Sequence, residues 1–124
     1  MTSEASIRAA LWTLIVVQTV MFATLLGRVP PHPPETTPLF GIGPLLAAAL
    51  SAAVAALVIG PPRSGGARML HLAAVALALV SFGPQKYLDA QFPLIWPAVV
   101  TAQLAIVIIM AGCFFPGKAQ RAGT

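Results

Sequence analysis

The side chains best suited to metal or thiol chemistry are two histidines and one cysteine, namely His32, His71 and Cys113. A single cysteine excludes a disulfide within the chain and any metal site made of cysteines alone. Under the topology derived below, the two histidines fall on opposite faces of a membrane, so they cannot share a metal ion within one chain. No basic residue or histidine adjoins Cys113 in the sequence to activate its thiol. We therefore predict neither a metal site nor a cofactor site.

A second group of residues could act by hydrogen bonding. Polar side chains fall near the midpoints of three apolar runs, and they are Gln18, Thr19, Ser51, Thr101 and Gln103. An unpaired amide in hydrocarbon costs several kcal/mol, so the two glutamines are expected to face protein or a cavity. This mid-membrane polar layer either joins helices by hydrogen bonds or forms a polar site or path, because transporters bind substrate at the midplane. No ionisable residue lies near these midpoints, which removes the usual carrier of proton-coupled transport.

Three residues near the start of the third apolar run could contact lipid headgroups: Arg63, Arg68 and His71. Glu35 lies among prolines in the first loop and has no second carboxylate beside it, so paired acid and base catalysis lacks its residues. We predict no catalytic residue, and the chain is not expected to be an enzyme. An enzyme that acts on a membrane lipid is kept as one alternative.

The elements that must position these residues are predicted from composition. The chain is 58% apolar and 8% charged, whereas soluble domains are roughly 45–50% apolar and about 25% charged. So few charges cannot cover a water-soluble globule. We predict an all-α membrane protein with a single transmembrane domain, residues 1–124, whose four transmembrane helices form an up-down bundle. The spans are placed at about 7–27, 41–60, 67–84 and 92–115, because a helix of about 20 residues matches the hydrocarbon core.

The third span is the weakest, because its charge-free part covers about 15 residues, or roughly 22 Å of helix. A half-buried or re-entrant segment is the alternative. Pro44 is expected in the first turn of the second helix, where a missing N–H is tolerated. Pro97 is expected to bend the fourth helix. A stiff Pro-rich loop outside the cytoplasm, residues 28–40, joins the first two spans.

Lysines and arginines are distributed unequally between the ends of the spans. One side has Arg8, Arg63, Arg68, Lys118 and Arg121, and the other has Arg28 and Lys86. The positive-inside rule then places both termini in the cytoplasm, and we expect a bacterial inner (plasma) membrane protein in contact with lipid. The basic residues are scattered along the chain and do not form a patch, so no nucleic acid is expected as a partner.

Small residues recur at four-residue spacing in the second span. They form two stripes, one of Ala48, Ala52 and Ala56 and the other of Ala47, Ser51 and Ala55, while the third span has Ala74 and Ala78. Such stripes let helix backbones approach closely in lipid. The partner helix belongs either to the same bundle or to another chain.

These features leave three classes of function open. The first is an accessory, assembly or scaffolding subunit that packs against other membrane-protein chains, and it accounts best for the lack of chemistry and the small residues. The second is a homo-oligomeric channel or transporter for a small solute, whose path the polar layer would line. The third is the lipid enzyme. We predict the first.

Overall fold

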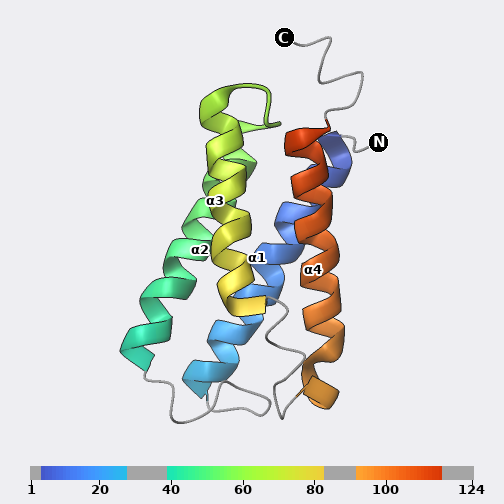
Figure 1. Cartoon of the computed structure of the whole chain (residues 1–124). Helices are drawn as coiled ribbons and strands as arrows, with labels where there is room; N and C mark the ends of the chain where they lie inside the picture. The colour runs from blue at the N-terminus through green and yellow to red at the C-terminus, as the bar shows by residue number, and fades with distance from the viewer. Residues whose placement is uncertain (1–3, 28–38, 83–91, 116–124) are drawn as a thin grey trace.

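The computed structural model describes residues 4–27, 39–82 and 92–115 (Figure 1). Nearly all of them belong to four helices, α1 (Glu4–Gly27), α2 (Leu39–Ile59), α3 (Gly65–Phe82) and α4 (Phe92–Phe114). Each helix runs in the opposite direction to the one before it, as the colours in Figure 1 show. The predicted all-helical fold with four helices is confirmed.

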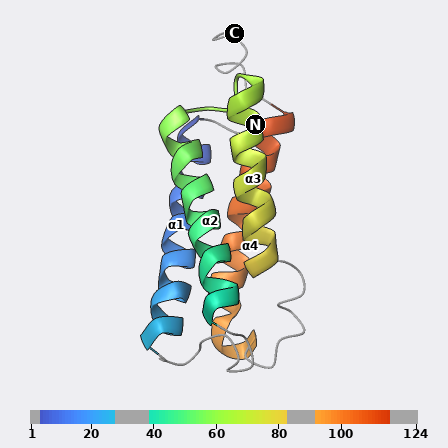
Figure 2. The same ribbon diagram turned by 90° about the vertical axis from the view of Figure 1, so that its left-hand side faces the viewer.

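Each helix packs against two others. Contacts join α1 to α2, α2 to α3, α3 to α4, and α4 back to α1. The helices therefore form a ring around one core, and their axes are roughly aligned in the side view of Figure 2. The third helix is the shortest, with 18 residues against 24 in α1, and the far ends of α1, α2 and α4 extend past its last turn (Figures 1 and 2).

The buried positions follow the helical repeat. On α1 they are Ile7, Ala10, Leu11, Leu14 and Gln18. Except for the adjacent pair Ala10 and Leu11, each follows the one before by three or four residues, as expected for one helix face. On the other three helices alanine takes many inward positions, namely Ala49, Ala53, Ala56, Ala67, Ala74, Ala78, Ala102 and Ala105. Small side chains allow neighbouring backbones to pack closely, and these alanines share the core with larger side chains such as Leu11, Leu14 and Ile109.

The residues between α2 and α3 explain why one helix ends and the next begins there. Gly60 has a φ of 94°, a left-handed conformation that glycine adopts without steric cost and that commonly ends a helix. Two prolines follow, and neither can continue the helix. The hydroxyl of Ser64 then accepts a hydrogen bond of 3.1 Å from the backbone N–H of Ala67, so Ser64 is the N-cap of α3.

Both internal prolines lie beyond the first turn of their helices. Pro44 is inside α2 and Pro97 is inside α4. The prediction for Pro44 was wrong because α2 begins at Leu39, two residues earlier than expected. Each proline removes one backbone hydrogen bond, yet both helices continue through it. The bend expected at Pro97 stays a prediction.

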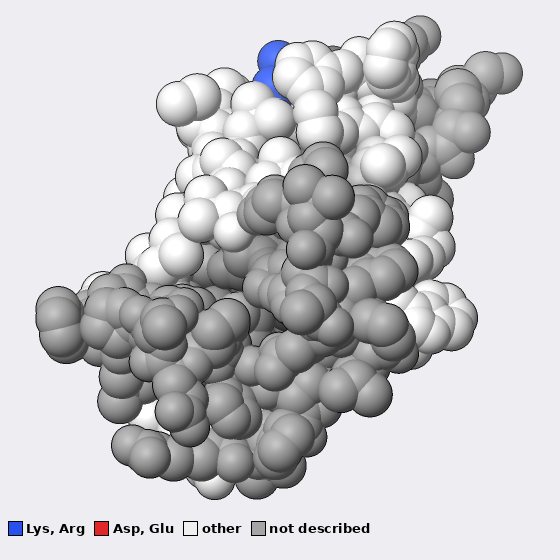
Figure 3. Space-filling model, turned by 60° about the horizontal axis from the view of Figure 1, so that its bottom comes forward, with Lys and Arg blue, Asp and Glu red and all other residues white. Residues whose placement is uncertain are grey.

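The outer surface of the ring carries many large apolar side chains. Large apolar side chains on all four helices are exposed, among them Trp12, Val16 and Val20 on α1, Val54 and Val58 on α2, Val80 on α3, and Leu104, Val107 and Phe114 on α4. Seen from the end where α3 stops, the described surface is almost wholly uncharged (Figure 3). A helix that is apolar all round belongs in a membrane or in the core of a larger protein.

Two of the helices are long and apolar enough to cross a membrane, in the segments Glu4–Thr24 and Trp96–Phe114. The apolar parts of the other two, Gly43–Ile59 and Gly65–Val80, are shorter. Length and composition therefore distinguish α1 and α4 from α2 and α3, whereas the sequence had placed the second span with the first and fourth.

Candidate functional site

Two polar side chains lie in the described core, Gln18 on α1 and His71 on α3, with exposed fractions of 1% and 0%. Gln18 follows Leu14 by four residues and Leu11 by seven, so the helical repeat brings it to the inward face of α1. His71 follows Ala67 by four residues and precedes Val75 by four, on the inward face of α3. Buried polar groups in a bundle are where function or strain is expected.

The amide of Gln18 has no hydrogen-bond partner for either Oε1 or Nε2. A glutamine amide carries two donors and an acceptor, so several bonds are left unmade inside an apolar core. Gln103, the other glutamine of the predicted layer, is half-buried on α4 and has an interaction partner. A hydrogen bond between helices through Gln18 is therefore not found among the described residues.

The hydroxyl residues of the predicted polar layer lie on the outside of the ring. Thr19, Ser51 and Thr101 are all exposed. The Ser51 hydroxyl donates to the carbonyl of Ala47 at 2.8 Å, and the Thr101 hydroxyl donates to the carbonyl of Pro97. A hydroxyl that bonds to its own helix can face lipid or a neighbouring helix without an unpaired donor. The structure therefore does not bring these three side chains together with Gln18 around one internal path.

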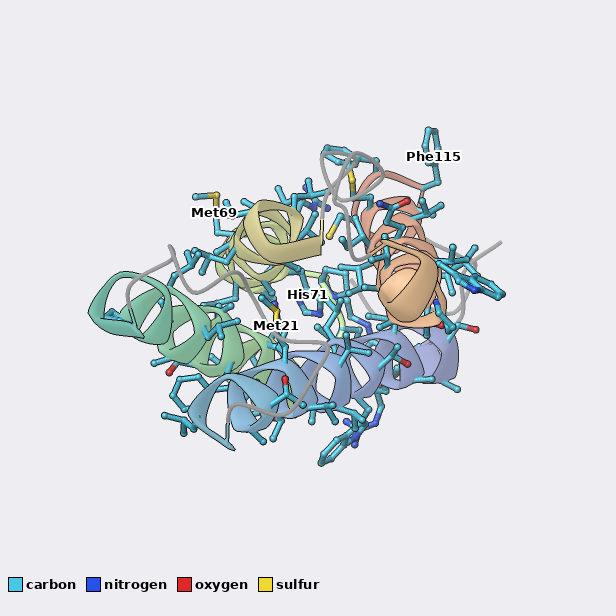
Figure 4. The ribbon with its side chains drawn as sticks, turned by 90° about the horizontal axis from the view of Figure 1, so that it is seen from below. Met21, Met69, His71 and Phe115 are labelled. Atoms are coloured by element: carbon cyan, nitrogen blue, oxygen red, sulfur yellow. The ribbon has the colours of Figure 1, made fainter. Side chains whose placement is uncertain are left out.

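His71 lies near the end of the bundle where α1 begins and α2 passes into α3. Its Nδ1 is 2.7 Å from the carbonyl oxygen of Ala67, and since a carbonyl only accepts, Nδ1 is the donor in this hydrogen bond. Its Nε2 is buried and has no hydrogen-bond partner. Viewed along the bundle, His71 lies between the helices, whereas Met69 and Phe115 point outward (Figure 4).

The three residues predicted to contact lipid headgroups, Arg63, Arg68 and His71, differ in how exposed their side chains are. Arg63 is exposed and forms an ion pair with Glu4, with 3.4 Å between Nη2 and Oε2. Arg68 is half-buried, and its Nε is buried without a hydrogen-bond partner. Headgroup contact by Arg63 and Arg68 stays a prediction, whereas His71 is fully buried and offers no surface to a headgroup.

A small cavity adjoins His71. It has a volume of about 10 Å³ and is lined by Glu4, Ile7, Arg8, Leu11, Ala56, Leu57, Gly60, Pro61 and His71. The ion pair between Glu4 and Arg63 lies beside it, because Glu4 belongs to both. Sequence reasoning missed this site because His71 was taken as an interfacial residue. The available signal was its spacing from Ala67, Ala74 and Ala78, small residues that repeat along the same face.

The remaining residues to place are those considered for metal and thiol chemistry. No group of three or more histidine, cysteine, aspartate or glutamate side chains lies close enough there to hold a metal ion. Cys113 is buried on α4, with an exposed fraction of 2%. His32 lies outside the described residues. Comparison with protein-family models, with curated proteins and with solved structures gives no match.

Proposed function

We propose that this chain is an integral membrane protein that acts as an accessory, assembly or scaffolding subunit and packs against other membrane-protein chains. The observation that carries the proposal is the outward face of α2. Ala47 and Ser51 are exposed there and Ala55 is half-buried, while Ala49, Ala53 and Ala56 fill the core on the opposite side. The stripe of Ala47, Ser51 and Ala55 thus lies largely outside the core. In the other predicted stripe, Ala48 is exposed and Ala52 half-buried, and Ala56 alone of the three is buried.

Insertion of all four helices is supported by the placement of charge as well as by the apolar exterior. Arg8 at the start of α1 and both Arg63 and Arg68 around the connection between α2 and α3 are at one end of the bundle, which the ion pair from Glu4 to Arg63 ties together. The positive-inside rule would put this end in the cytoplasm of a bacterial cell, with both termini. The shorter α2 and α3 would then rely on their long neighbours and on local thinning of the bilayer.

The first prediction concerns this topology. In a Cys113→Ser background, a cysteine introduced by Ser64→Cys is expected to react with a membrane-impermeant maleimide only after the cells are opened. A cysteine introduced by Thr36→Cys is expected to react in intact cells. Labelling is measured by the mass shift of the purified chain.

If the cysteines introduced by Ser64→Cys and Thr36→Cys both reacted from one side of the membrane, this result would contradict four crossings. Denatured samples of each variant provide the control, because both cysteines must react fully there. A soluble pool of the chain that labels equally at both positions would contradict insertion itself.

The proposed contact surface is a shallow groove along α2, lined by Leu50, Ser51, Val54, Ala55, Val58 and Ile59. Every side chain in it is small, β-branched or aliphatic, and the one hydroxyl is already bonded to its own helix. In lipid, helices associate through close packing of such surfaces and not through a hydrophobic driving force. A transmembrane helix of another chain fits this chemistry, because it can seat its own side chains against the small positions.

The second prediction tests the subunit role. Extraction from the native membrane in a mild detergent, followed by mass measurement, is expected to give a complex of defined composition with at least one different chain. Ala47→Phe, which places a ring on the outward stripe, is expected to reduce recovery of that partner by about tenfold or more, equivalent to about 1.4 kcal/mol.

Ala76→Phe is the matched control, because Ala76 is an exposed alanine in the middle of α3 and lies on a different helix. It is expected to leave the complex intact. Isolation of only a monomer or only a homo-oligomer from the native membrane would overturn the proposal.

A homo-oligomeric channel or transporter is the second candidate, and one observation favours it. Gln18 keeps an unbonded amide in the core, which a polar solute could use in another arrangement of the helices. Large buried side chains such as Leu14, Leu46 and Ile109 fill the interior, so a path through a single bundle would require that rearrangement.

A further inference from the structure

All arginine and acidic side chains of the described residues lie at one end of the bundle. They are Glu4 and Arg8 near the start of α1, Arg63 between α2 and α3, and Arg68 in the first turns of α3. Three arginines are thus balanced by one carboxylate. In the orientation proposed above, this end lies at the cytoplasmic leaflet, whose anionic lipids attract basic residues.

The single carboxylate already has a partner. Glu4 forms its ion pair with Arg63, with 3.4 Å between Oε2 and Nη2, so Arg63 has a counter-charge within the chain. No ion pair joins Arg68 to another described residue, and its Nε is buried without a hydrogen-bond partner. An unmade hydrogen bond costs more at a buried charged group than at a neutral one. Arg68 therefore lacks an anionic acceptor among the described residues.

Arg68 lies beside the last turn of α4. Its charge acts on the thiol of Cys113, so the guanidinium of α3 is close to this part of α4. The side chain is half-buried, which leaves part of it accessible from outside the bundle. The missing acceptor can therefore approach Arg68 at the seam between α3 and α4.

Large apolar side chains surround this end of the two helices. Met69, next to Arg68, and Phe115, directly after α4, have exposed fractions of 68% and 72%, and both point outward (Figure 4). A guanidinium binds phosphate through two parallel N–H groups. A ligand with an anionic phosphate and acyl chains matches both the arginine and its apolar surroundings.

We propose that Arg68 binds the phosphate of an anionic phospholipid at the seam between α3 and α4, with the acyl chains along the apolar exterior of these helices. Basic pockets between transmembrane helices on the cytoplasmic side are a recurring kind of headgroup site. The inference rests on the proposed insertion into a membrane and not on the proposed partner chain. It is therefore tested on the isolated chain.

The third prediction concerns the choice of headgroup. The full-length chain is placed in mild-detergent micelles with equal amounts of phosphatidylglycerol and phosphatidylcholine that have the same acyl chains. Native mass spectrometry is expected to show phosphatidylglycerol as the first bound lipid about fivefold more often, because one basic residue near an anionic headgroup contributes about this factor. The choline of the other lipid places a positive charge near the guanidinium.

Two variants separate a site at Arg68 from a general attraction to this end of the bundle. Arg68→Gln is expected to bring the ratio of the two bound lipids close to one. Arg63→Gln is the matched control, because it removes the same charge from an arginine that has its own counter-charge, and it is expected to leave the ratio unchanged. Circular dichroism checks that both variants keep the helical content of the parent.

An equal fall of the ratio in both variants overturns the proposal. A ratio near one in the parent also overturns it, and this is the result expected if a carboxylate of a partner chain is the counter-charge of Arg68. Displacement of phosphatidylglycerol by millimolar inorganic phosphate would assign the site to a soluble anion and overturn the lipid.

The experiment stays decisive if Arg68→Gln does not fold, because the ratio in the parent and its persistence in Arg63→Gln are measured without that variant. Failure of the lipid site is also distinct from failure of the proposed function. Insertion is tested by the maleimide labels, and the subunit role by the composition of the native complex.

Discussion

Ala78→Leu is expected to destabilise the bundle by about 1–3 kcal/mol or to rearrange it, because the larger side chain overpacks a core that is already filled. Ala78 on α3 has an exposed fraction of 0%, as has Ala102 on α4. Both belong to the same core cluster. The cluster is already filled by larger side chains such as Leu11, Leu14 and Ile109, so a leucine at this position must displace them or push neighbouring helices apart.

The measurement is the free energy of unfolding in mixed micelles, followed by the loss of helical circular dichroism and of tertiary contacts. Ala76→Leu is the matched control, since Ala76 is exposed on the same helix, two residues from Ala78. We expect this change to alter the free energy of unfolding by less than about 0.5 kcal/mol. Equal effects of the two leucines would mean that α3 does not present the face described here to the core.

Gln18→Leu is expected to change the free energy of unfolding in the opposite direction and to stabilise the bundle by about 1–3 kcal/mol. Both polar atoms of the amide are buried without a partner, and the penalty for such groups is lost when an apolar side chain of similar size replaces them. The same unfolding measurement shows the gain as a higher concentration of denaturing detergent at the midpoint.

Gln103→Leu is the control for this change, because Gln103 is half-buried and has an interaction partner. Its replacement is not expected to stabilise the protein, because its side chain is not fully buried. A loss of stability in Gln18→Leu would instead support the hypothesis that Gln18 joins helices. A gain in stability combined with lost solute flux in liposomes would favour the channel or transporter, since functional sites commonly sacrifice stability.

The helices were predictable because apolar length is a strong signal that depends on nothing beyond the local sequence. All four observed helices overlap the apolar runs 7–27, 41–60, 67–84 and 92–115. The start of α2 could not be predicted from Pro44. A proline is favoured in the first turn of a helix, but a helix can also begin before it and continue through it. The break after Ile59 was predictable, since glycine followed by two prolines stops any helix.

The directions of the polar side chains could not be predicted from depth alone. Depth along a helix places Gln18, Ser51 and Thr101 at one level, but the side of the helix on which each lies depends on the packing of its neighbours. Gln18 turned out to be inside, and Ser51 and Thr101 outside. The burial of His71 could have been inferred from the alanines that share its face, but its charge-bearing neighbours at Arg63 and Arg68 favoured an interfacial position.

The contact between α1 and α4 joins the two ends of the chain, whereas every other contact in the ring is between helices that follow one another. During synthesis, α1, α2 and α3 can therefore pair as they emerge, each with its predecessor, and the inward face of α1 stays half covered until α4 is made. Closure of the ring thus depends on a contact between helices far apart in the sequence. A chain truncated before Phe92 would leave the inward face of α1, including the amide of Gln18, uncovered on the side where α4 packs, and exposed core surface of this kind makes incomplete chains prone to aggregation.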